Sequence, residues 1–243
     1  MRRYDPGVIR VFAGPSLAGW VAASPFVRHP PVAACDLLQL LGGDACTVVL
    51  IDGYFDSRRA VWHKEVLQLM AAGFRMIGAA SMGALRAAEL APFGMIGTGA
   101  IARAYTSGQI TGDDEVAVVH APVAMGARPL SLAQIDARHV LVRAARAGVL
   151  PVFAARQLRE LSSRIHFRDR TWDAAIVTGR AAGLSLDSFE RWLPANSRSL
   201  KEADASAALE LALTLAPSPP LPRPEPPRTC YLTDAAAFAG VVL

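Results

Sequence analysis

Residues 47–90 read TVVLIDGYFDSRRAVWHKEVLQLMAAGFRMIGAASMGALRAAEL. Two short apolar runs in this stretch, Thr47–Ile51 and Phe74–Gly78, have the length and composition of buried strands. A helical pattern follows each run, over 60–72 after the first and over 84–90 after the second. Strands that alternate with helices across short turns predict a parallel α/β sheet. The stretch therefore decides the fold class.

The same alternation continues on both sides of it. Val8–Ala13 is predicted to be another strand, and Val116–Val119 is predicted to be a fourth. Ser131 is expected to cap the first helix of a helical region. Helices are expected over 15–23, 35–41, 131–148, 151–165, 171–181, 185–193 and 199–216, with an extended connector at 29–31. The sequence thus predicts an α/β fold, a parallel-sheet core with flanking helices followed by a helical C-terminal region.

The chain is expected to divide into three regions. These are an α/β core domain over 1–145, a helical region packed on it over 146–216, and a linker with a tail over 217–243. Seven of the eleven residues in 217–227 are prolines, which is typical of a polyproline-like linker or a surface-wrapping segment. For the residues that follow, a docking tail and a strand added to the sheet both stay open.

Composition excludes several classes of protein. A hydrophobic share of 52% excludes a wholly disordered chain of 243 residues. No apolar stretch reaches the roughly 18 residues that a transmembrane helix needs. The apolar run after the polar N-terminus breaks at Gly14 and Pro15, so no signal peptide is predicted. We therefore expect a cytoplasmic protein without a membrane partner.

Charge and cysteine content argue against nucleic-acid and metal binding. The 25 basic residues are 23 arginines and two lysines, scattered with no run longer than two, which does not predict a nucleic-acid surface. The three cysteines are widely spaced without a CxxC pair, so neither a disulfide framework nor a zinc site is predicted. The glycine-rich segment 94–99 lacks a nucleotide-binding signature. We expect no metal and no cofactor.

Ser81 is the candidate nucleophile. It lies in GAASMG over 78–83, at a predicted turn from strand to helix, where small neighbours permit the tight turn of a nucleophile elbow. The amide of Met82, at the start of the helix, is a candidate donor to an oxyanion, and the amide of Gly53, at the end of another strand, is a second. The motif departs from GxSxG because Ala79 replaces the first glycine. A serine that only caps the helix is the alternative.

His120 is the candidate general base, since it ends the predicted strand 116–119 and a nucleophilic serine needs a base. Asp114 is the candidate carboxylate that orients it, with Asp52 and Asp36 as rivals. His63 is a second candidate base.

Further residues are candidates for binding the substrate. Asp52 and Asp113 are the acidic ones, and Asp113 belongs to the run 113–115 that precedes the predicted strand. His63, Lys64 and Arg86 are the basic ones. Lys64 is one of only two lysines in an arginine-rich chain, and a coding bias does not explain its place inside the segment 62–65.

Several blocks in order resemble the TfuA-like family. The resemblance spans roughly residues 8–145, and the pattern departs at AACD over 33–36, where the family tends toward Arg-Gly-Asp. The blocks are VFAGPSL over 11–17, IDGYF over 51–55, VWHKEVL over 61–67, GAASMGALRAAEL over 78–90, FGMIGTG over 93–99 and DDEVAVVH over 113–120.

The resemblance implies a role in the biosynthesis of modified peptides. TfuA-like proteins accompany YcaO enzymes, which convert backbone amides of a precursor peptide to thioamides. The TfuA-like partner is implicated in releasing sulfide from a thiocarboxylated sulfur-carrier protein. On this basis Ser81 attacks the thiocarboxylate, His120 takes its proton, and Met82 and Gly53 hold the oxyanion. His63, Lys64 or Arg86 supplies positive charge to the sulfur.

Two other functions stay open at this point. One is a non-catalytic adaptor that docks the sulfur carrier onto the YcaO enzyme, in which Ser81 only caps a helix. The other is a serine peptidase-like hydrolase.

Overall fold

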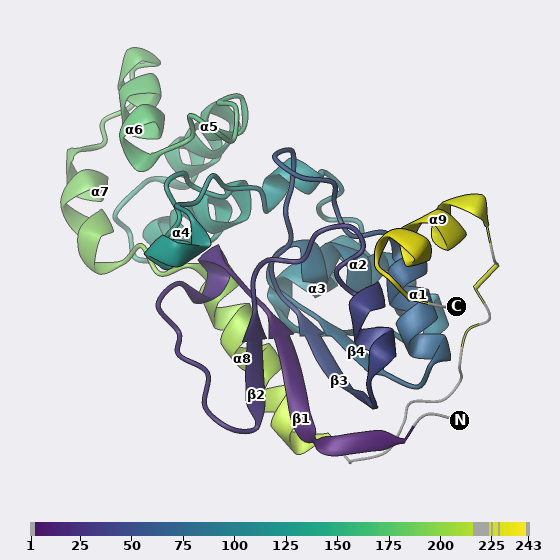
Figure 1. Cartoon of the computed structure of the whole chain (residues 1–243). Helices are drawn as coiled ribbons and strands as arrows, with labels where there is room; N and C mark the ends of the chain where they lie inside the picture. The colour runs from purple at the N-terminus through teal and green to yellow at the C-terminus, as the bar shows by residue number, and fades with distance from the viewer. Residues whose placement is uncertain (1–2, 216–223, 225, 228, 242–243) are drawn as a thin grey trace.

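The computed structural model describes residues 3–215, 224, 226–227 and 229–241. Its centre is a parallel sheet of five strands in the order β2-β1-β3-β4-β5 (Figure 1). The strands are β1 (Tyr4–Phe12), β2 (Phe26–His29), β3 (Ala45–Leu50), β4 (Arg75–Gly78) and β5 (Ile96–Gly97). The predicted α/β class with a parallel sheet is therefore confirmed.

The helices follow in the order expected of an α/β core with a helical continuation. They are α1 (His63–Ala71), α2 (Met82–Leu90), α3 (Gly99–Thr106), α4 (Gln134–Arg146), α5 (Val152–Ser163), α6 (Trp172–Ala181), α7 (Asp187–Trp192), α8 (Leu200–Thr214) and α9 (Cys230–Phe238). Short 3-10 turns lie at Pro15–Leu17, Leu38–Gly42, Ala91–Phe93, Asp113–Glu115, Val123–Met125 and Leu193–Ala195. Among the described residues, no helix has both the length and the apolar character needed to cross a membrane.

Alternation along the central strands separates two hydrophobic layers. In β3, Val48 and Leu50 face the layer that contains α1 and the apolar side of α9. Val49, between them, faces the opposite layer, which α8 covers. Both sheet faces are buried, which explains why the strand sequences are continuous apolar runs.

α8 lies close against the sheet because its inward side is made of alanine. Ala205, Ala208 and Ala212 are buried against that face. At its first turn, the carboxylate of Asp136 in α4 accepts hydrogen bonds from the backbone N–H groups of Leu200 and Lys201 at 2.7 and 3.2 Å. Lys201 is thereby positioned near the carboxyl ends of the strands.

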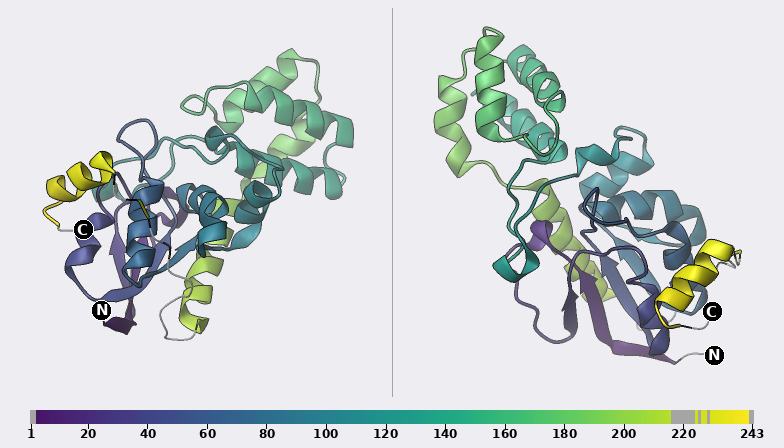
Figure 2. Two further views of the ribbon diagram at one scale, coloured as in Figure 1. Left: turned by 90° about the vertical axis from the view of Figure 1, so that its right-hand side faces the viewer. Right: turned by 45° about the horizontal axis from the view of Figure 1, so that its top comes forward.

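Helices α4–α7 have a hydrophobic core of their own. Leu141, Leu158, Ile176 and Phe189 belong to this cluster. The group lies beyond one end of the sheet, on the side of the molecule away from α9, in Figure 1 and in both views of Figure 2.

The predicted strand Val116–Val119 is wrong. After the 3-10 turn Asp113–Glu115 the chain is extended but does not join the sheet, whose far edge is β5 instead. The backbone groups of Val119 bond to the Ser131 hydroxyl and the Leu130 N–H, so they are not available to a neighbouring strand.

Other local expectations also need correction. Ser131 does not cap α4, because its hydroxyl accepts the Val119 N–H and the helix begins at Gln134. The helix expected over 15–23 is only the 3-10 turn Pro15–Leu17, and the helix expected over 35–41 is the 3-10 turn Leu38–Gly42. β2 was not predicted, and His29, expected in a connector, is its last residue.

The tail is a helix and not an added strand. Leu232, Ala235 and Ala236 of α9 pack into the core layer that contains α1. Most of the proline-rich segment expected over 217–227 lies outside the described residues.

Candidate functional site

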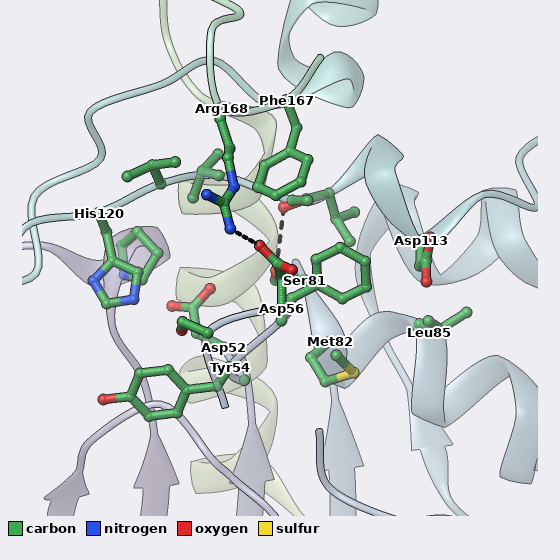
Figure 3. Close-up of a pocket in the computed structure, with 18 residues that line it drawn as sticks. Asp52, Tyr54, Asp56, Ser81, Met82, Leu85, Asp113, His120, Phe167 and Arg168 are labelled. Carbon is green, nitrogen blue, oxygen red and sulfur yellow. Dashed lines mark hydrogen bonds and ion pairs between the residues drawn. The ribbon is translucent and has the colours of Figure 1, made fainter. Parts of the chain in front are cut away.

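A cavity of about 300 Å³ lies at the carboxyl ends of the central strands, where sites form in parallel α/β sheets (Figure 3). Six residues that the sequence indicated line it: Asp52, Gly53, Ser81, Met82, Asp113 and His120. They come from the turn after β3, the turn from β4 to α2, and the 3-10 turn Asp113–Glu115 with the segment that follows it. The structure thus gathers residues from three separate blocks of the sequence.

The turn that presents Ser81 is sharply bent. Ala80 has a φ of +66°, in the left-handed region that favours glycine. The Ser81 N–H donates to the Ala79 carbonyl two residues back, at 2.7 Å, which closes a tight γ-turn of the rare positive-φ type. Backbone conformations of this kind persist where the surrounding structure holds them, and they concentrate at functional sites.

Two glycines let α2 start directly beside the strands. A side-chain carbon on Gly83 would lie 1.8 Å from the Leu50 carbonyl oxygen, and one on Gly78 would lie 2.1 Å from the Gly83 oxygen. Both approaches are impossible for any other residue without movement of the backbone. The glycines of the GAASMG motif therefore permit the close approach of helix and sheet at the serine.

The Ser81 side chain does not cap α2. Ser81 occupies the N-cap position, but its hydroxyl makes no hydrogen bond to an N–H of the first turn. Instead Oγ donates to the carbonyl oxygen of Val116 at 3.4 Å, across the base of the cavity (Figure 3). The capping role that the sequence left open is thus not the role that this hydroxyl has in the fold.

The residues that carry the two candidate oxyanion donors, Gly53 and Met82, lie side by side. Within the described chain, the N–H groups of Gly53 and Met82 make no hydrogen bond. The residues are in contact, since a side-chain carbon on Gly53 would lie 2.9 Å from the Met82 Cβ. Unpaired N–H groups beside a helix N-terminus are suited to a developing negative charge.

Asp52 is buried and fully engaged with the turn after β1. Its Oδ2 accepts the N–H groups of Gly14 and Ser16 at 2.8 and 2.9 Å, and its Oδ1 accepts the Ser16 hydroxyl at 2.6 Å. The carboxylate therefore joins the ends of β1 and β3 in the wall of the cavity.

Lys201 lies beside this site, in the lining of a neighbouring cavity, and sequence reasoning did not indicate it. Its side chain is 3% exposed, and Nζ donates to the Val116 carbonyl at 2.7 Å, the same oxygen that Ser81 uses. Burial lowers the pKa of the Lys201 ammonium, and the charges of Asp52 and Asp136 act in the opposite direction. The one signal in the sequence was the rarity of lysine, and it had pointed to Lys64.

His120 lines the same cavity as Ser81 but is not bonded to it. Its Nδ1 lies 2.7 Å from the Ala121 carbonyl oxygen, and its ring lies 6.0 Å from that of Tyr54 between centroids. With Nδ1–H donating to this carbonyl, Nε2 is left to act on a ligand.

The acidic run separates into three environments. Asp113 lines the cavity, Asp114 lies 3.5 Å from the buried guanidinium of Arg170, and Glu115 forms a two-pronged ion pair with Arg138 of α4. Asp114 as the residue that orients His120 stays a prediction.

The part of the chain that contains Gly53, Ser81 and His120 matches a known protein family. The family model described as TfuA-like protein matches residues 52–171, about half of the chain. The chain is a member of the TfuA-like family. A search of curated proteins found no match. The matched segment contains Gly53, Ser81 and His120, whereas Lys201 lies outside it.

In this TfuA-like protein the basic candidates of α1 and α2 do not line the cavity. His63 Nε2 and Arg86 Nη1 both contact Glu89 Oε2, at 2.7 and 2.5 Å. Lys64 Nζ donates to the Thr229 hydroxyl at 3.0 Å, just before α9.

The cation at the mouth of the cavity is Arg168, which the sequence did not indicate. It forms an ion pair with Asp56, and beside it the rings of Phe55 and Phe167 pack at 5.8 Å (Figure 3). Loop α5–α6 of the helical region thereby meets the loop after β3 over the cavity.

Proposed function

We propose that this TfuA-like protein hydrolyses the C-terminal thiocarboxylate of a sulfur-carrier protein and releases sulfide for thioamidation of a peptide backbone by a YcaO enzyme. The observation that carries the proposal is the Ser81 turn. Its hydroxyl is presented at the base of the cavity without capping α2, and the N–H groups of Gly53 and Met82 beside it are unpaired within the described chain.

The chemistry follows that of acyl transfer. The Ser81 oxygen gives up its proton to a base at the site as it bonds to the thiocarboxyl carbon, and the oxygen of that carbon becomes an oxyanion held by the two amides. The carbon–sulfur bond then breaks, and the sulfur leaves as hydrogen sulfide after taking up a proton. Water cleaves the acyl-enzyme and regenerates the serine. The products are the carrier carboxylate and sulfide, and no cofactor is needed.

His120 is suited to deliver a proton to the leaving sulfur. A thiocarboxylate anion resists attack, so a proton donor or a positive charge at the sulfur aids the reaction. His120 lines the cavity with Nε2 available, and Arg168 lies at its mouth. The cavity of about 300 Å³ has room for an unbranched tail such as Gly-Gly.

Mass spectrometry of the thiocarboxylated carrier, mixed with this protein alone, tests the proposal. We expect catalytic conversion to carboxylate with release of sulfide, and a loss of at least ~100-fold in Ser81→Ala. Ser107→Ala, an exposed serine at the end of α3, is the matched control.

Two outcomes would replace the proposal. An adaptor for the YcaO enzyme leaves the carrier intact while binding it. A serine peptidase-like hydrolase cleaves ordinary peptides or activated esters and spares the thiocarboxylate.

A further inference from the structure

A groove of about 410 Å³ lies between α4 and α5, in the helical region of the chain. The two helices form a hairpin across the short connection 147–151, and their inner sides pack into the core of that region. On α5 the groove is lined by Val152, Ala155, Arg156 and Arg159, spaced as i, i+3, i+4 and i+7. The lining residues of α4 follow the same spacing, so each helix contributes one whole face to the groove.

The floor of the groove is aliphatic and open to water. Leu141 and Ala155 at its base belong to the hydrophobic core of the helical region. Val142 and Val152, which also line it, are 46% and 57% exposed. All of its lining residues come from α4 and α5, so no other element of the described chain covers it. Aliphatic side chains left in water along a groove between two helices are typical of a surface that binds another protein segment.

Arginines surround this floor, and most of them lack a counter-charge. Arg138 is engaged, because it forms an ion pair with Glu115. The side chains of Arg146, Arg156 and Arg159 form no ion pair or hydrogen bond within the described chain. Among the described residues that line the groove, none is acidic. Arg156 and Arg159 lie one turn apart on the same helix face and repel each other, so the groove is complementary to acidic side chains.

We propose that this groove binds an amphipathic helix of a protein partner, with aliphatic side chains along one face and acidic side chains beside them. The aliphatic face packs on Val142 and Val152, and the carboxylates pair with the three unpaired arginines. None of the residues that line the groove also lines the cavity at Ser81. The inference therefore does not depend on the reaction proposed for that cavity.

The aliphatic floor favours a peptide over the other anionic partners. A nucleic-acid backbone pairs with arginines but gains little from an aliphatic floor. A lipid surface binds protruding apolar side chains, whereas this floor is recessed between two helices.

Fluorescence anisotropy with the full chain and a labelled synthetic peptide tests the proposal. The probe is a helical peptide of about 16 residues, with leucines at i, i+3, i+4 and i+7 and glutamates beside them. The reference peptide has the same composition, but its leucines are spread around the helix. At roughly 150 mM salt, which screens long-range attraction between charges, we expect the striped peptide to bind about 10-fold more tightly.

Two variants locate the bound peptide. Arg156→Glu should weaken binding by about 10-fold, because it replaces an attraction with a repulsion. Val142→Gln should weaken it by about 5-fold, because it removes an aliphatic contact. Arg191→Glu is the matched control, since Arg191 is an exposed arginine on α7 that does not line the groove. Both altered groove residues are exposed, and thermal unfolding checks that each variant keeps the fold.

Several outcomes would overturn the proposal. Equal affinity for the two peptides, or binding of neither, shows that the aliphatic stripe is not recognised. Unchanged affinity in Arg156→Glu and Val142→Gln, or equal weakening in Arg191→Glu, places the peptide elsewhere. A DNA duplex or a phosphatidylserine vesicle that binds more tightly than the striped peptide, and depends on Arg156, assigns the groove to that partner instead.

Discussion

The hydroxyl of Ser16 donates a 2.6 Å hydrogen bond to Oδ1 of Asp52. The two residues follow β1 and β3, which are neighbouring strands of the sheet. Their hydrogen bond fixes the turn after β1 and holds the Asp52 carboxylate in the wall of the cavity that Ser81 also lines. The position of that charge has a consequence for Lys201, whose ammonium it stabilises.

Asp52→Asn is therefore expected to lower the pKa of the Lys201 ammonium further below its ordinary value. Loss of the carboxylate charge removes an influence that raises the pKa of Lys201, so the amine becomes neutral at lower pH. Asparagine retains an acceptor for the N–H groups of Gly14 and Ser16. The NMR signal of the Lys201 side chain, followed from pH 5 to about 10 in a chain with only two lysines, gives the midpoint.

Ser16→Ala is the control for this experiment. It removes the 2.6 Å hydrogen bond but keeps the charge of Asp52, so the midpoint should stay close to that of the wild type. An unchanged midpoint in Asp52→Asn would contradict the role of this carboxylate.

His120→Ala is expected to slow sulfide release by ~100-fold, while the labelling of Ser81 by a fluorophosphonate probe should slow much less. Fluoride leaves without the help of an acid, whereas sulfide leaves more readily when protonated. The comparison of the two rates separates a donor to the leaving group from a base that activates Ser81. His139→Ala, on α4, serves as the histidine control. Equal losses in the two assays would assign His120 to the serine instead.

Ala80→Gly is expected to be at least about 1 kcal/mol more stable than Ala79→Gly. Both alanines are fully buried, so both variants lose a similar methyl contact. Only Ala80 has a positive φ, at +66°, and glycine relieves that conformation. Urea unfolding of the two variants measures the difference, and equal destabilisation would show that the turn is not strained.

Gly83→Ala is expected to destabilise the fold by at least about 2 kcal/mol and to slow Ser81 labelling. The added carbon would lie 1.8 Å from the Leu50 oxygen, so α2 must move away from β3. Gly42→Ala is the contrast, because a carbon there meets nothing within 4 Å. Thermal unfolding compares them, and a tolerated Gly83→Ala would be the contrary result.

Glu65 makes stability depend on pH in an unusual direction. Its carboxyl is fully buried in α1, Oε1 accepts the Trp62 N–H, and Oε2 has no hydrogen-bond partner in the described chain. Burial raises its pKa from 4.5 to about 7. Between these values the folded protein keeps a proton that the unfolded chain has lost, so stability falls as pH rises.

We expect Glu65→Gln to lack this fall, which should amount to roughly 2–3 kcal/mol between the two pKa values. Glutamine keeps an acceptor for Trp62 and carries no charge. Denaturant unfolding from pH 4 to about 8 measures the difference, with the exposed Glu210→Gln as the control that retains the fall. Parallel curves for wild type and Glu65→Gln would contradict the raised pKa.

Local patterns in the sequence were sufficient for much of the fold and for the place of Ser81 at a strand-to-helix turn. The apolar run in β3 reflects the burial of both faces of the sheet. The small residues before Ser81 reflect the tight turn from strand to helix. The same reasoning was wrong for Val116–Val119, whose apolar composition fits a strand. Those residues are instead held outside the sheet by a side chain and a loop, and composition carries no information about such partners.

The sequence by itself determined that this chain forms a parallel α/β sheet and that Ser81 lies at a strand-to-helix turn, because periodicity and glycine placement act over a few residues. Only the tertiary structure decided which charged groups meet that serine. Lys201 reaches the Val116 carbonyl because the alanine side of α8 packs on the sheet, while Lys64 is directed to Thr229 and α9. Burial of a charge depends on contacts between distant segments, and no local pattern specifies them.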